Sequence, residues 1–229
     1  SIDINRINFQ YPNSKQDIIK DLTFSIPVSR KIAIVGTTGS GKSTTVDIIL
    51  GLLDPIDGSL RVGGKIIDNN NKRSWQKMIG YVPQQIYLSD ESVAANIAFG
   101  VEKKNINQEA VEQAAKLANL HEFVVKELDN KYDTTIGERG IRLSGGQRQR
   151  IGIARALYRK PKVMIFDEAT NALDNVTEKT VMNAIYNLEN SVTVILITHR
   201  MSTVESFDKI ILLDKGSLKA QGTFEELNK

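Results

Sequence analysis

Alternating apolar and polar residues mark the N-terminal part of the chain. Residues 2–9 follow this pattern, and residues 22–26 repeat it after a polar turn. Residues 59–62 and 65–67 continue it on either side of a Gly-Gly pair that favours a tight turn. Alternation of this kind is typical of strands with one buried face. The pattern therefore predicts an antiparallel sheet built from these four segments.

Other segments are almost continuously apolar, at residues 31–35, 163–166 and 192–197. Strands that are buried on both faces have this composition, as in a parallel sheet covered by helices. Ligands of such sheets bind at the carboxyl ends of the strands, so the groups that follow these runs are expected at one edge. Residues 210–213 and 217–220 are expected to complete the sheet, and a short terminal helix should follow at residues 224–227.

Helical periodicity appears in the middle of the chain. From residue 107 to 125 the apolar residues recur at helical spacing, and Gly and Pro are absent. Another helix is expected to begin at Ser144, and its buried side would consist of Ile151, Ile153, Ala154 and Leu157. We therefore predict a helical subdomain over residues 86–160, inserted into an α/β core formed by residues 1–85 and 161–229.

Composition limits the classes of protein that remain. Of the 229 residues, 41% are hydrophobic and 25% are charged, which is ordinary for a globular protein large enough to bury a core. There is no Cys, so disulfides, thiolate metal ligands and Cys nucleophiles are excluded. The net charge of +3 is too small to indicate a nucleic-acid partner. No apolar run approaches the ~20 residues of a membrane helix, so we expect the isolated chain to be soluble.

The stretch after the first apolar run has the sequence Gly-Thr-Thr-Gly-Ser-Gly-Lys-Ser-Thr. A strand, a Gly-rich turn and a helix in that order are what a phosphate-binding loop requires, and the alternative is a chance Gly-rich turn. The glycines let successive N–H groups face one anion, and the helix start adds partial positive charge. Lys42 is expected to reach the β- and γ-phosphates of a nucleotide, and Ser43 to bind Mg²⁺. The predicted binding residues are Gly36, Thr37, Thr38, Gly39, Ser40, Gly41, Lys42, Ser43 and Thr44.

Two of the apolar runs end in residues that can carry catalysis. Asp167 and Glu168 follow residues 163–166, and His199 follows residues 192–197 and Thr198. An Asp in this position is the expected Mg²⁺ partner, while Glu168 is placed to orient and deprotonate an attacking water. His199 is expected to hydrogen-bond the γ-phosphate and to hold Glu168. The alternatives are a solvated acidic pair and a structural histidine, the role that we assign to His121.

A second anion-binding helix start is expected at Leu143, Ser144, Gly145, Gly146 and Gln147. Ser144 would cap the helix, while the two glycines would expose backbone N–H groups. The loop at residues 36–44 already provides a cradle for one nucleotide, so the second cradle suggests the nucleotide of another molecule. Tyr11 follows the first strand and is a candidate for stacking on a base, although an aromatic residue there is most often part of the core.

Together these motifs resemble the nucleotide-binding domain of an ATP-binding cassette (ABC) transporter, and the resemblance covers essentially the whole chain. Residues 36–44 resemble the Walker A motif of that family, and residues 163–168 its Walker B motif, with Glu168 as the catalytic carboxylate. Residues 143–147 match the family signature, Leu-Ser-Gly-Gly-Gln, without a change. The resemblance also implies the roles of a Q-loop glutamine that contacts Mg²⁺, a D-loop aspartate, a switch histidine and an adenine-stacking aromatic for Gln84, Asp174, His199 and Tyr11, respectively.

The resemblance implies an α/β fold: a RecA-like P-loop NTPase core with a mostly parallel sheet, an N-terminal antiparallel β-subdomain and an inserted helical subdomain. Residues 90–100 and 137–140 resemble segments of type IV exporters, which move lipids, lipid-linked sugars, peptides or drugs. In such exporters the second of these segments contacts the coupling helices of the transmembrane domain. Asn171 stands where exporters commonly have Ser or Thr, a departure that leaves every catalytic residue type in place.

The family works as a head-to-tail dimer, so the resemblance implies two ATP molecules and Mg²⁺ between facing domains. Each ATP would lie between residues 36–44 of one chain and residues 144–146 of the other. We expect a homodimer, with a transmembrane domain N-terminal to this domain in the same full-length chain. That domain would hold the ATPase at the cytoplasmic face of the inner or plasma membrane and would contain the cargo site.

Two other classes of protein keep the same motifs. Soluble ABC ATPases of the SMC and DNA-repair type, or of the translation-factor type, clamp nucleic acid with the help of long coiled coils or tandem cassettes, and this chain has neither. A degenerate regulatory cassette would bind ATP without hydrolysing it, but Glu168, His199 and the intact signature argue against that class. We therefore predict the ATPase domain of an exporter, with no nucleic-acid partner.

Overall fold

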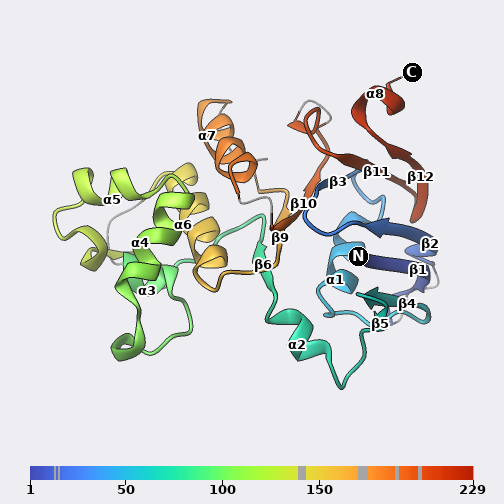
Figure 1. Cartoon of the computed structure of the whole chain (residues 1–229), viewed down its shortest axis with the longest axis horizontal. Helices are drawn as coiled ribbons and strands as arrows, with labels where there is room; N and C mark the ends of the chain where they lie inside the picture. The colour runs from blue at the N-terminus through green and yellow to red at the C-terminus, as the bar shows by residue number, and fades with distance from the viewer. Residues whose placement is uncertain are drawn as a thin grey trace. The chain divides into compact units, whose positions relative to one another are not determined.

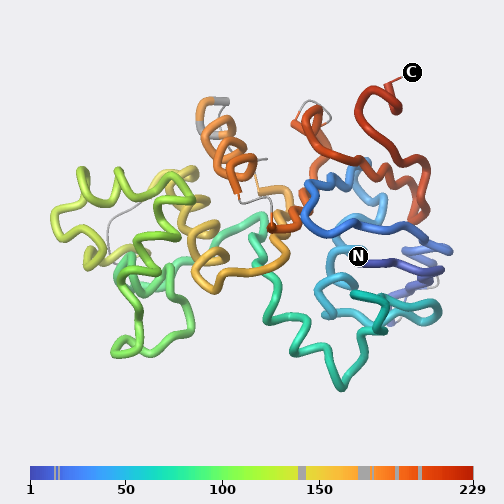
Figure 2. The backbone as a smooth tube through the Cα atoms, in the orientation of Figure 1, coloured from blue at the N-terminus to red at the C-terminus, as the bar shows by residue number. Residues whose placement is uncertain are grey.

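The computed structural model describes residues 1–12, 14, 16–138, 143–169, 175–188, 191–200 and 203–228. The chain forms two compact units, and the backbone can be followed through both (Figures 1 and 2). The first unit contains Ser1–Ile79, Lys162–Glu168 and Asn190–Lys229, and the second contains Gly80–Pro161 and Ala169–Glu189. Residues 169–189 thus group with the second unit, whereas the sequence prediction placed them with the core. The functional division of the chain remains a prediction.

The first unit contains the expected antiparallel sheet, with the strand order β2-β1-β4-β5. Its strands are β1 (Ile2–Phe9), β2 (Ile19–Ile26), β4 (Asp57–Val62) and β5 (Lys65–Ile66). The sequence of β1 breaks its alternation between Ile4 and Ile7, which are both buried. A β-bulge resolves the break, because the register with β2 shifts there and Arg6 takes a φ of 49°. The extra residue returns Ile7 to the buried face.

The first unit also contains the expected, mostly parallel sheet, in which its strands follow the order β12-β11-β3-β10-β9. These strands are β3 (Lys31–Val35), β9 (Val163–Asp167), β10 (Thr193–Thr198), β11 (Lys209–Asp214) and β12 (Ser217–Gly222). Strand β10 pairs in parallel with both β3 and β9, β11 pairs in parallel with β3, and β12 is antiparallel to β11. Strand β6 (Ile79–Val82) begins at the end of this unit and continues into the second. The fold class predicted from the sequence is confirmed.

Helices α1 (Lys42–Ile49), α2 (Lys72–Gln76) and α8 (Phe224–Leu227) belong to the first unit. The last carbonyl groups of a helix have no partner within it, and side chains of α2 bind two of these groups at the end of α1. Trp75 Nε1 donates to the carbonyl oxygen of Ile49 at 2.7 Å, and Gln76 Nε2 donates to that of Leu50 at 3.0 Å. The predicted terminal helix, α8, begins at a capping box between Thr223 and Glu226.

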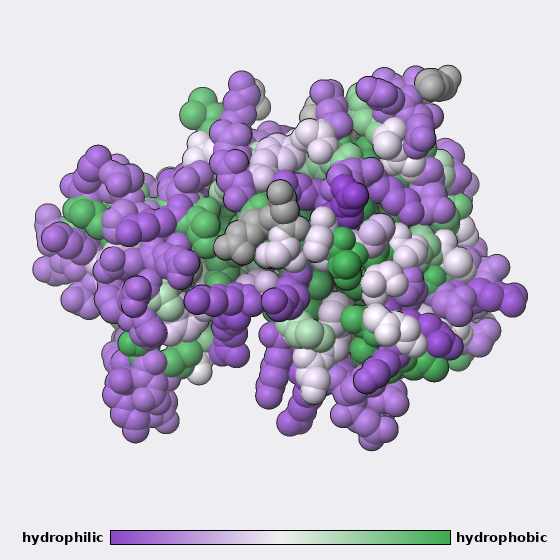
Figure 3. All heavy atoms as spheres, viewed as in Figure 1, coloured by the Kyte–Doolittle hydropathy of each residue, from purple (hydrophilic) through white to green (hydrophobic). Residues whose placement is uncertain are grey.

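The second unit is mainly helical, and helix α6 packs against α3, α4 and α7 (Figure 1). Over this unit, at the left of Figure 3, most of the surface shown is hydrophilic. No helix in the described parts of the chain combines the length and the apolar character needed to cross a membrane. The elements are β7 (Glu91–Ser92), α3 (Val93–Ile97), η1 (Lys103–Asn105), α4 (Gln108–Leu117), α5 (His121–Glu127), η2 (Lys131–Asp133), β8 (Thr135–Ile136), α6 (Gly145–Tyr158) and α7 (Asn175–Tyr186).

The predicted helical segment at residues 107–125 consists of two helices, α4 and α5, rather than one. The break lies at Asn119, whose φ is 53°, a left-handed conformation that Asn tolerates. The N–H of Leu120 donates to the carbonyl of Ala115 at 2.8 Å, and the N–H of Asn119 donates to that of Lys116 at 3.1 Å. These two bonds form a Schellman motif, which ends a helix. The apolar periodicity conceals this end, because Leu120 is buried like Ala115 and Ala118 of the preceding turn.

The bond between Trp75 and α1 predicts the cost of losing one buried hydrogen bond. Trp75 is 2% exposed, so the substitution Trp75→Phe would leave the carbonyl of Ile49 buried without its donor. We expect the free energy of unfolding to fall by about 1–3 kcal/mol, measured by urea denaturation. The control Asp21→Asn removes an exposed ion pair with Arg6 and should change that free energy by less than about 1 kcal/mol. Equal effects of the two substitutions would contradict the stabilising role of the Trp75 bond.

Candidate functional site

The loop between β3 and α1 has a backbone that only glycine allows. Gly39 and Gly41 take positive φ values of 80° and 95°, and Gly41 is the N-cap residue of α1. A Cβ on Gly36 would lie 2.4 Å from Ser40 Oγ and 2.5 Å from the carbonyl oxygen of Leu213, so no side chain fits there. The loop therefore reaches the N-terminus of α1 as a close-packed turn, which is the geometry that favours a bound anion.

Lys42 places a fixed positive charge in this loop. The residue is only 5% exposed, and its ammonium group donates to the carbonyl oxygens of Gly36 and Thr37, each at 2.9 Å. An ammonium group has three N–H donors, so one remains beyond these two contacts. The loop and its lysine thus fit a ligand with several negatively charged oxygens, such as a triphosphate.

The parallel register brings the other candidate residues to the same sheet edge. Ile197 of β10 pairs with Ile34 of β3 on one side and with Asp167 of β9 on the other. The backbone N–H of Glu168 donates to the carbonyl oxygen of Ile197 at 3.0 Å, which extends this pairing by one residue. Only β10 separates β9 from β3, so the two strand ends lie about 10 Å apart. The sequence predicted this convergence.

Glu168 has a backbone conformation that the sequence did not predict. Its φ is 48°, which is uncommon for a residue other than Gly, Asn or Asp. Such conformations cost roughly 1–3 kcal/mol and persist only where the surrounding structure imposes them, as it also does at Arg6 and Asn119 outside the candidate site. Of the two adjacent carboxylates, Glu168 is therefore the one that the fold holds in a strained position. This supports the catalytic role that we predicted for it.

His199 and the phosphate loop line one cavity. This cavity has a volume of about 500 Å³, and its walls consist of Val35, Gly36, Thr37, Thr38, His199 and Leu212. The histidine follows β10 directly, so the strand order accounts for its position beside the loop that follows β3. The structure therefore brings His199 to the predicted nucleotide site, and its chemistry is available to a ligand there.

Tyr11 also lies beside the phosphate loop. Its hydroxyl is 3.2 Å from Thr44 Oγ1 in the first turn of α1, and its ring packs edge-on against Phe9 with 5.0 Å between the ring centres. Tyr11 is 39% exposed. The residue is therefore not part of the core, and part of its ring is free to stack on a base.

The oxygen atoms near the loop suit a magnesium ion. Ser43 and Asp167 offer the hydroxyl and carboxylate ligands that Mg²⁺ prefers. Among the described residues, no three His, Cys, Asp or Glu side chains come together as a metal site of their own. An ion that takes one or two protein ligands and completes its shell with phosphate and water fits this arrangement.

The start of helix α6 is the second predicted anion site. Ser144 is its N-cap: its Oγ accepts from the N–H of Gln147 at 3.2 Å, and Gln147 Oε1 accepts from the N–H of Ser144 at 2.8 Å. This capping box satisfies two backbone donors and fixes the first turn. Gly145 and Gly146 follow in that turn, where a helix has no internal acceptor for their N–H groups. Ser144 and Gly145 are exposed, so the helix start is accessible to another molecule.

The roles of all the predicted site residues remain predictions, and for two of them, Gln84 and Asp174, no position beside the phosphate loop is described. Gln84 follows β6 in the second unit, whereas the phosphate loop belongs to the first. Asp174, Asn171 and the residues between them lie outside the described residues. By contrast, His121 has the structural role that we assigned to it, because its Nδ1 lies 2.8 Å from the hydroxyl of Tyr132.

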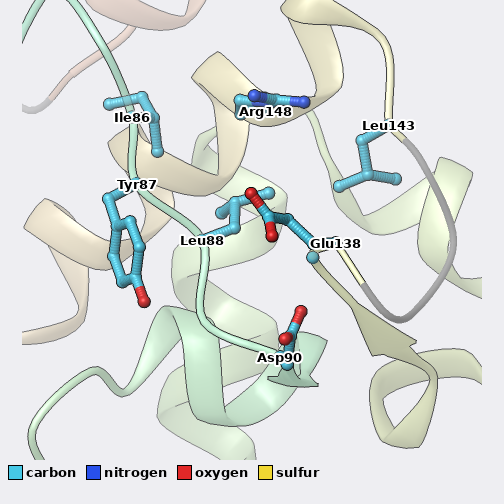
Figure 4. A pocket seen from close by; sticks show the side chains of 8 residues that line it. Ile86, Tyr87, Leu88, Asp90, Glu138, Leu143 and Arg148 are labelled. Carbon is cyan, nitrogen blue, oxygen red and sulfur yellow. The ribbon is translucent and has the colours of Figure 1, made fainter.

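The second unit contains a groove of about 720 Å³ that the sequence did not reveal. In Figure 4 the segment that carries Ile86 to Asp90 runs beside helix α6, which carries Arg148. Asp90 and Glu138 come from the two exporter-like segments, so these segments meet in the groove. The segment from Ile86 to Leu88 forms another wall of the groove. Its only signal in the sequence is Tyr87, an aromatic residue in an irregular segment, which is 70% exposed. The groove is lined by Ile86, Tyr87, Leu88, Asp90, Gly137, Glu138, Leu143 and Arg148.

Comparisons with known proteins agree with this geometry. Residues 19–171 match the family model described as ABC transporter. The chain is 37% identical over 228 residues to ATP-binding cassette sub-family B member 5 of Mus musculus. That match covers 99% of this chain and 18% of the mouse protein. The chain is also 40% identical over 226 residues to the ATP-dependent lipid A-core flippase of Saccharophagus degradans. That match covers 99% of this chain and 38% of the flippase.

A solved structure, that of a bacterial Atm1-family ABC exporter with ATP bound, is similar to this chain, with a TM-score of 0.89 and 35% identity. The match covers 99% of this chain and 39% of the exporter chain. This chain thus spans less than two fifths of the length of each of these proteins. None of these findings supports the alternative of a soluble ATPase that clamps nucleic acid.

The lack of space around Gly36 predicts a loss of nucleotide affinity. A Cβ added by Gly36→Ala must displace either Ser40 or the backbone of Leu213, which would distort the loop. We expect ATP affinity to fall at least tenfold, measured by equilibrium titration with a fluorescent ATP analogue. Thr38→Ala is the matched control in the same loop, since Thr38 is exposed and keeps its backbone N–H. It should change the affinity less than threefold, and similar losses in both variants would contradict the packing argument.

Proposed function

We propose that this chain, which belongs to the ABC transporter family as the ATP-hydrolysing domain of an exporter, holds ATP and Mg²⁺ at the edge of its parallel sheet and completes that site with a second such domain. The observation that supports this best is the presence of two anion-binding helix starts, at α1 and α6. One lies in each unit, and one nucleotide requires only the first.

The residues at the sheet edge have distinct roles in binding. The backbone of residues 36–44 and the ammonium group of Lys42 bind the phosphates, and Tyr11 stacks on the adenine. Ser43 and Asp167 hold Mg²⁺, directly or through water, with Gln84 as a further ligand that senses the γ-phosphate. An ion held by these residues would neutralise negative charge on the phosphate chain.

Hydrolysis requires a base next to the γ-phosphate. Glu168 orients a water molecule and takes its proton as the water oxygen attacks the γ-phosphorus, an effect worth ~10²–10⁴ in rate. The bond from the γ-phosphorus to the bridging oxygen breaks, which gives ADP and inorganic phosphate. His199 donates a hydrogen bond to the γ-phosphate and holds the Glu168 carboxylate in place. The shared cavity of His199 and the phosphate loop supports this role.

The second domain supplies what one chain lacks. Ser144, Gly145 and Gly146 of the facing chain donate to the γ-phosphate, and Asp174 contributes across the same interface. Closure excludes water and adds preorganised donors, so the transition state is stabilised only in the dimer. Release of the products then lets the dimer open. The exposed, capped start of α6 supports this arrangement, for which we propose two identical chains.

A transmembrane domain is the proposed partner of the groove in Figure 4. We infer that it lies N-terminal to this domain in the same full-length chain and holds the ATPase at the cytoplasmic face of the membrane. The large part of each relative that this chain does not match supports such a domain. The groove follows Gln84 in sequence, so a change at the γ-phosphate has a short path to it. The cargo is recognised by the transmembrane domain.

Removing the proposed base predicts a separation of binding from turnover. Glu168→Gln keeps the size of the side chain but cannot accept the proton, so we expect ATP binding to persist while hydrolysis falls by about 10²-fold or more. The variant should accumulate as an ATP-bound dimer, visible by size-exclusion chromatography with light scattering. Lys42→Ala provides the contrast, because it should lose ATP binding itself. Wild-type turnover in Glu168→Gln would contradict the assigned role.

A site shared between two chains predicts that activity depends on concentration. The specific ATPase activity of the wild-type chain should rise with protein concentration below saturation, because only the dimer has complete sites. The measurement is phosphate release at saturating ATP and Mg²⁺ over a hundredfold range of protein. A specific activity that stays constant while light scattering shows monomer would overturn the shared site.

A further inference from the structure

One buried side-chain amide, that of Asn96, holds the segment from Ile86 to Ser92 in place. Asn96 of helix α3 is 0% exposed, and its Nδ2 donates to the carbonyl oxygens of Ser89, Glu91 and Ser92 at 3.0, 3.3 and 3.1 Å. Its Oδ1 accepts from the N–H of Ser89 at 3.0 Å. Residues 86–90 belong to no strand, so the side chain of Asn96 satisfies backbone groups there, whereas Glu91 and Ser92 form β7 and also pair with β8.

Arg155 connects Asn96 to helix α6, which begins just after Ser144. Its Nε donates to the backbone carbonyl of Asn96 at 2.8 Å, and its Nη2 donates to Asn96 Oδ1 at 3.3 Å. A third bond runs from Nη1 to the carbonyl oxygen of Tyr87 at 2.9 Å, while the guanidinium carbon lies 4.6 Å from the ring centre of Phe99. A planar group with several donors is needed for this set of bonds, and Lys has no such group.

An apolar contact on α6 reinforces these bonds. A Cβ on Gly152 would lie 2.4 Å from Cδ1 and 2.8 Å from Cγ1 of Ile86, so the missing side chain lets Ile86 rest directly on the helix. Gly152 and Arg155 are three residues apart and therefore lie on one helix face. The start of the segment is thus held to α6 at two neighbouring points. We call the group formed by Asn96, Arg155 and Gly152 the Asn96 clasp.

We propose that Asn96 and Arg155 are positioning residues, which make the segment from Ile86 to Ser92 and helix α6 move as one body. The segment forms a wall of the groove, and α6 begins with the residues that face the second nucleotide (Figure 4). A displacement in the groove therefore reaches Ser144 and Gly145 without being absorbed in an irregular loop. This inference rests on the proposed function, in which the transmembrane domain occupies the groove.

The first test measures local opening in the wild-type chain and in Arg155→Met. The N–H of Ser89 should exchange with deuterium at least tenfold faster in the variant, while the exchange of amides in α4 should not change. Arg159→Met is the matched control at the C-cap of the same helix, because Arg159 is exposed, and it should leave the exchange of Ser89 unchanged. Unchanged exchange of Ser89 in Arg155→Met would overturn the clasp.

The second test separates positioning from stability in the full-length transporter. We compare its ATP turnover with that of the 229-residue chain and expect the transmembrane domain to change the wild-type rate. In Arg155→Met the effect of the transmembrane domain on ATP turnover should be at least fivefold smaller than in the wild type, while KM for ATP stays within twofold of the wild-type value. Arg155→Lys, the milder variant, should restore part of the change. The positioning role would be overturned by either of two results. In the first, the transmembrane domain does not alter the wild-type ATP turnover. In the second, it alters the turnover of Arg155→Met as much as that of the wild type.

The two tests also separate this inference from the proposed function. If the wild-type chain and the full-length protein hydrolyse no ATP, the proposed function fails, but the exchange of Ser89 still decides whether the clasp holds the segment. If both hydrolyse ATP and Arg155→Met accelerates exchange without affecting coupling, the clasp is only structural. If exchange and coupling change together, the positioning role is supported.

Discussion

The parallel pairing of β10 with both β3 and β9 is the constraint on which the candidate site depends. No single element contains the chemistry, since the phosphate loop follows β3, the carboxylates end β9 and His199 follows β10. Because the strands run in the same direction, all these groups arrive at one edge. The buried apolar residues of the strands therefore do more than stabilise the fold. They set the distances between groups that are far apart in the sequence.

The elements that the sequence predicts well are those determined by hydrophobic burial, the largest favourable term in folding. The three apolar runs are of this kind, while the helix start at Ser144 is predicted from a local signal, the residues of its capping box. The features that it misses depend on one or two backbone angles. The bulge at Arg6, the helix end at Asn119 and the strained φ of Glu168 each involve roughly 1–3 kcal/mol, and packing around them decides the outcome.

The groove and the clasp escaped prediction for a different physical reason. The segment from Ile86 to Ser92 has no periodic pattern, and its partners are backbone carbonyl groups, which every residue type carries. The sequence does not indicate which backbone carbonyl groups a side chain such as Asn96 will hydrogen-bond. The proposed site shared between two chains, by contrast, is a prediction from the sequence alone, because it rests on counting two anion-binding motifs where one nucleotide needs a single motif.

The ammonium group of Lys42 gives the phosphate loop a property that its shape alone would not. In the described contacts its partners are neutral carbonyl groups, so the fold buries a positive charge without an opposite one. Keeping such a charge from water is costly, and a ligand with several negative charges relieves most of that cost. The loop thus selects ligands by charge before it selects them by shape. At the proposed site a nucleoside without phosphates would leave the ammonium group of Lys42 without a negatively charged partner, so we expect recognition to depend first on the phosphate chain and only then on the base.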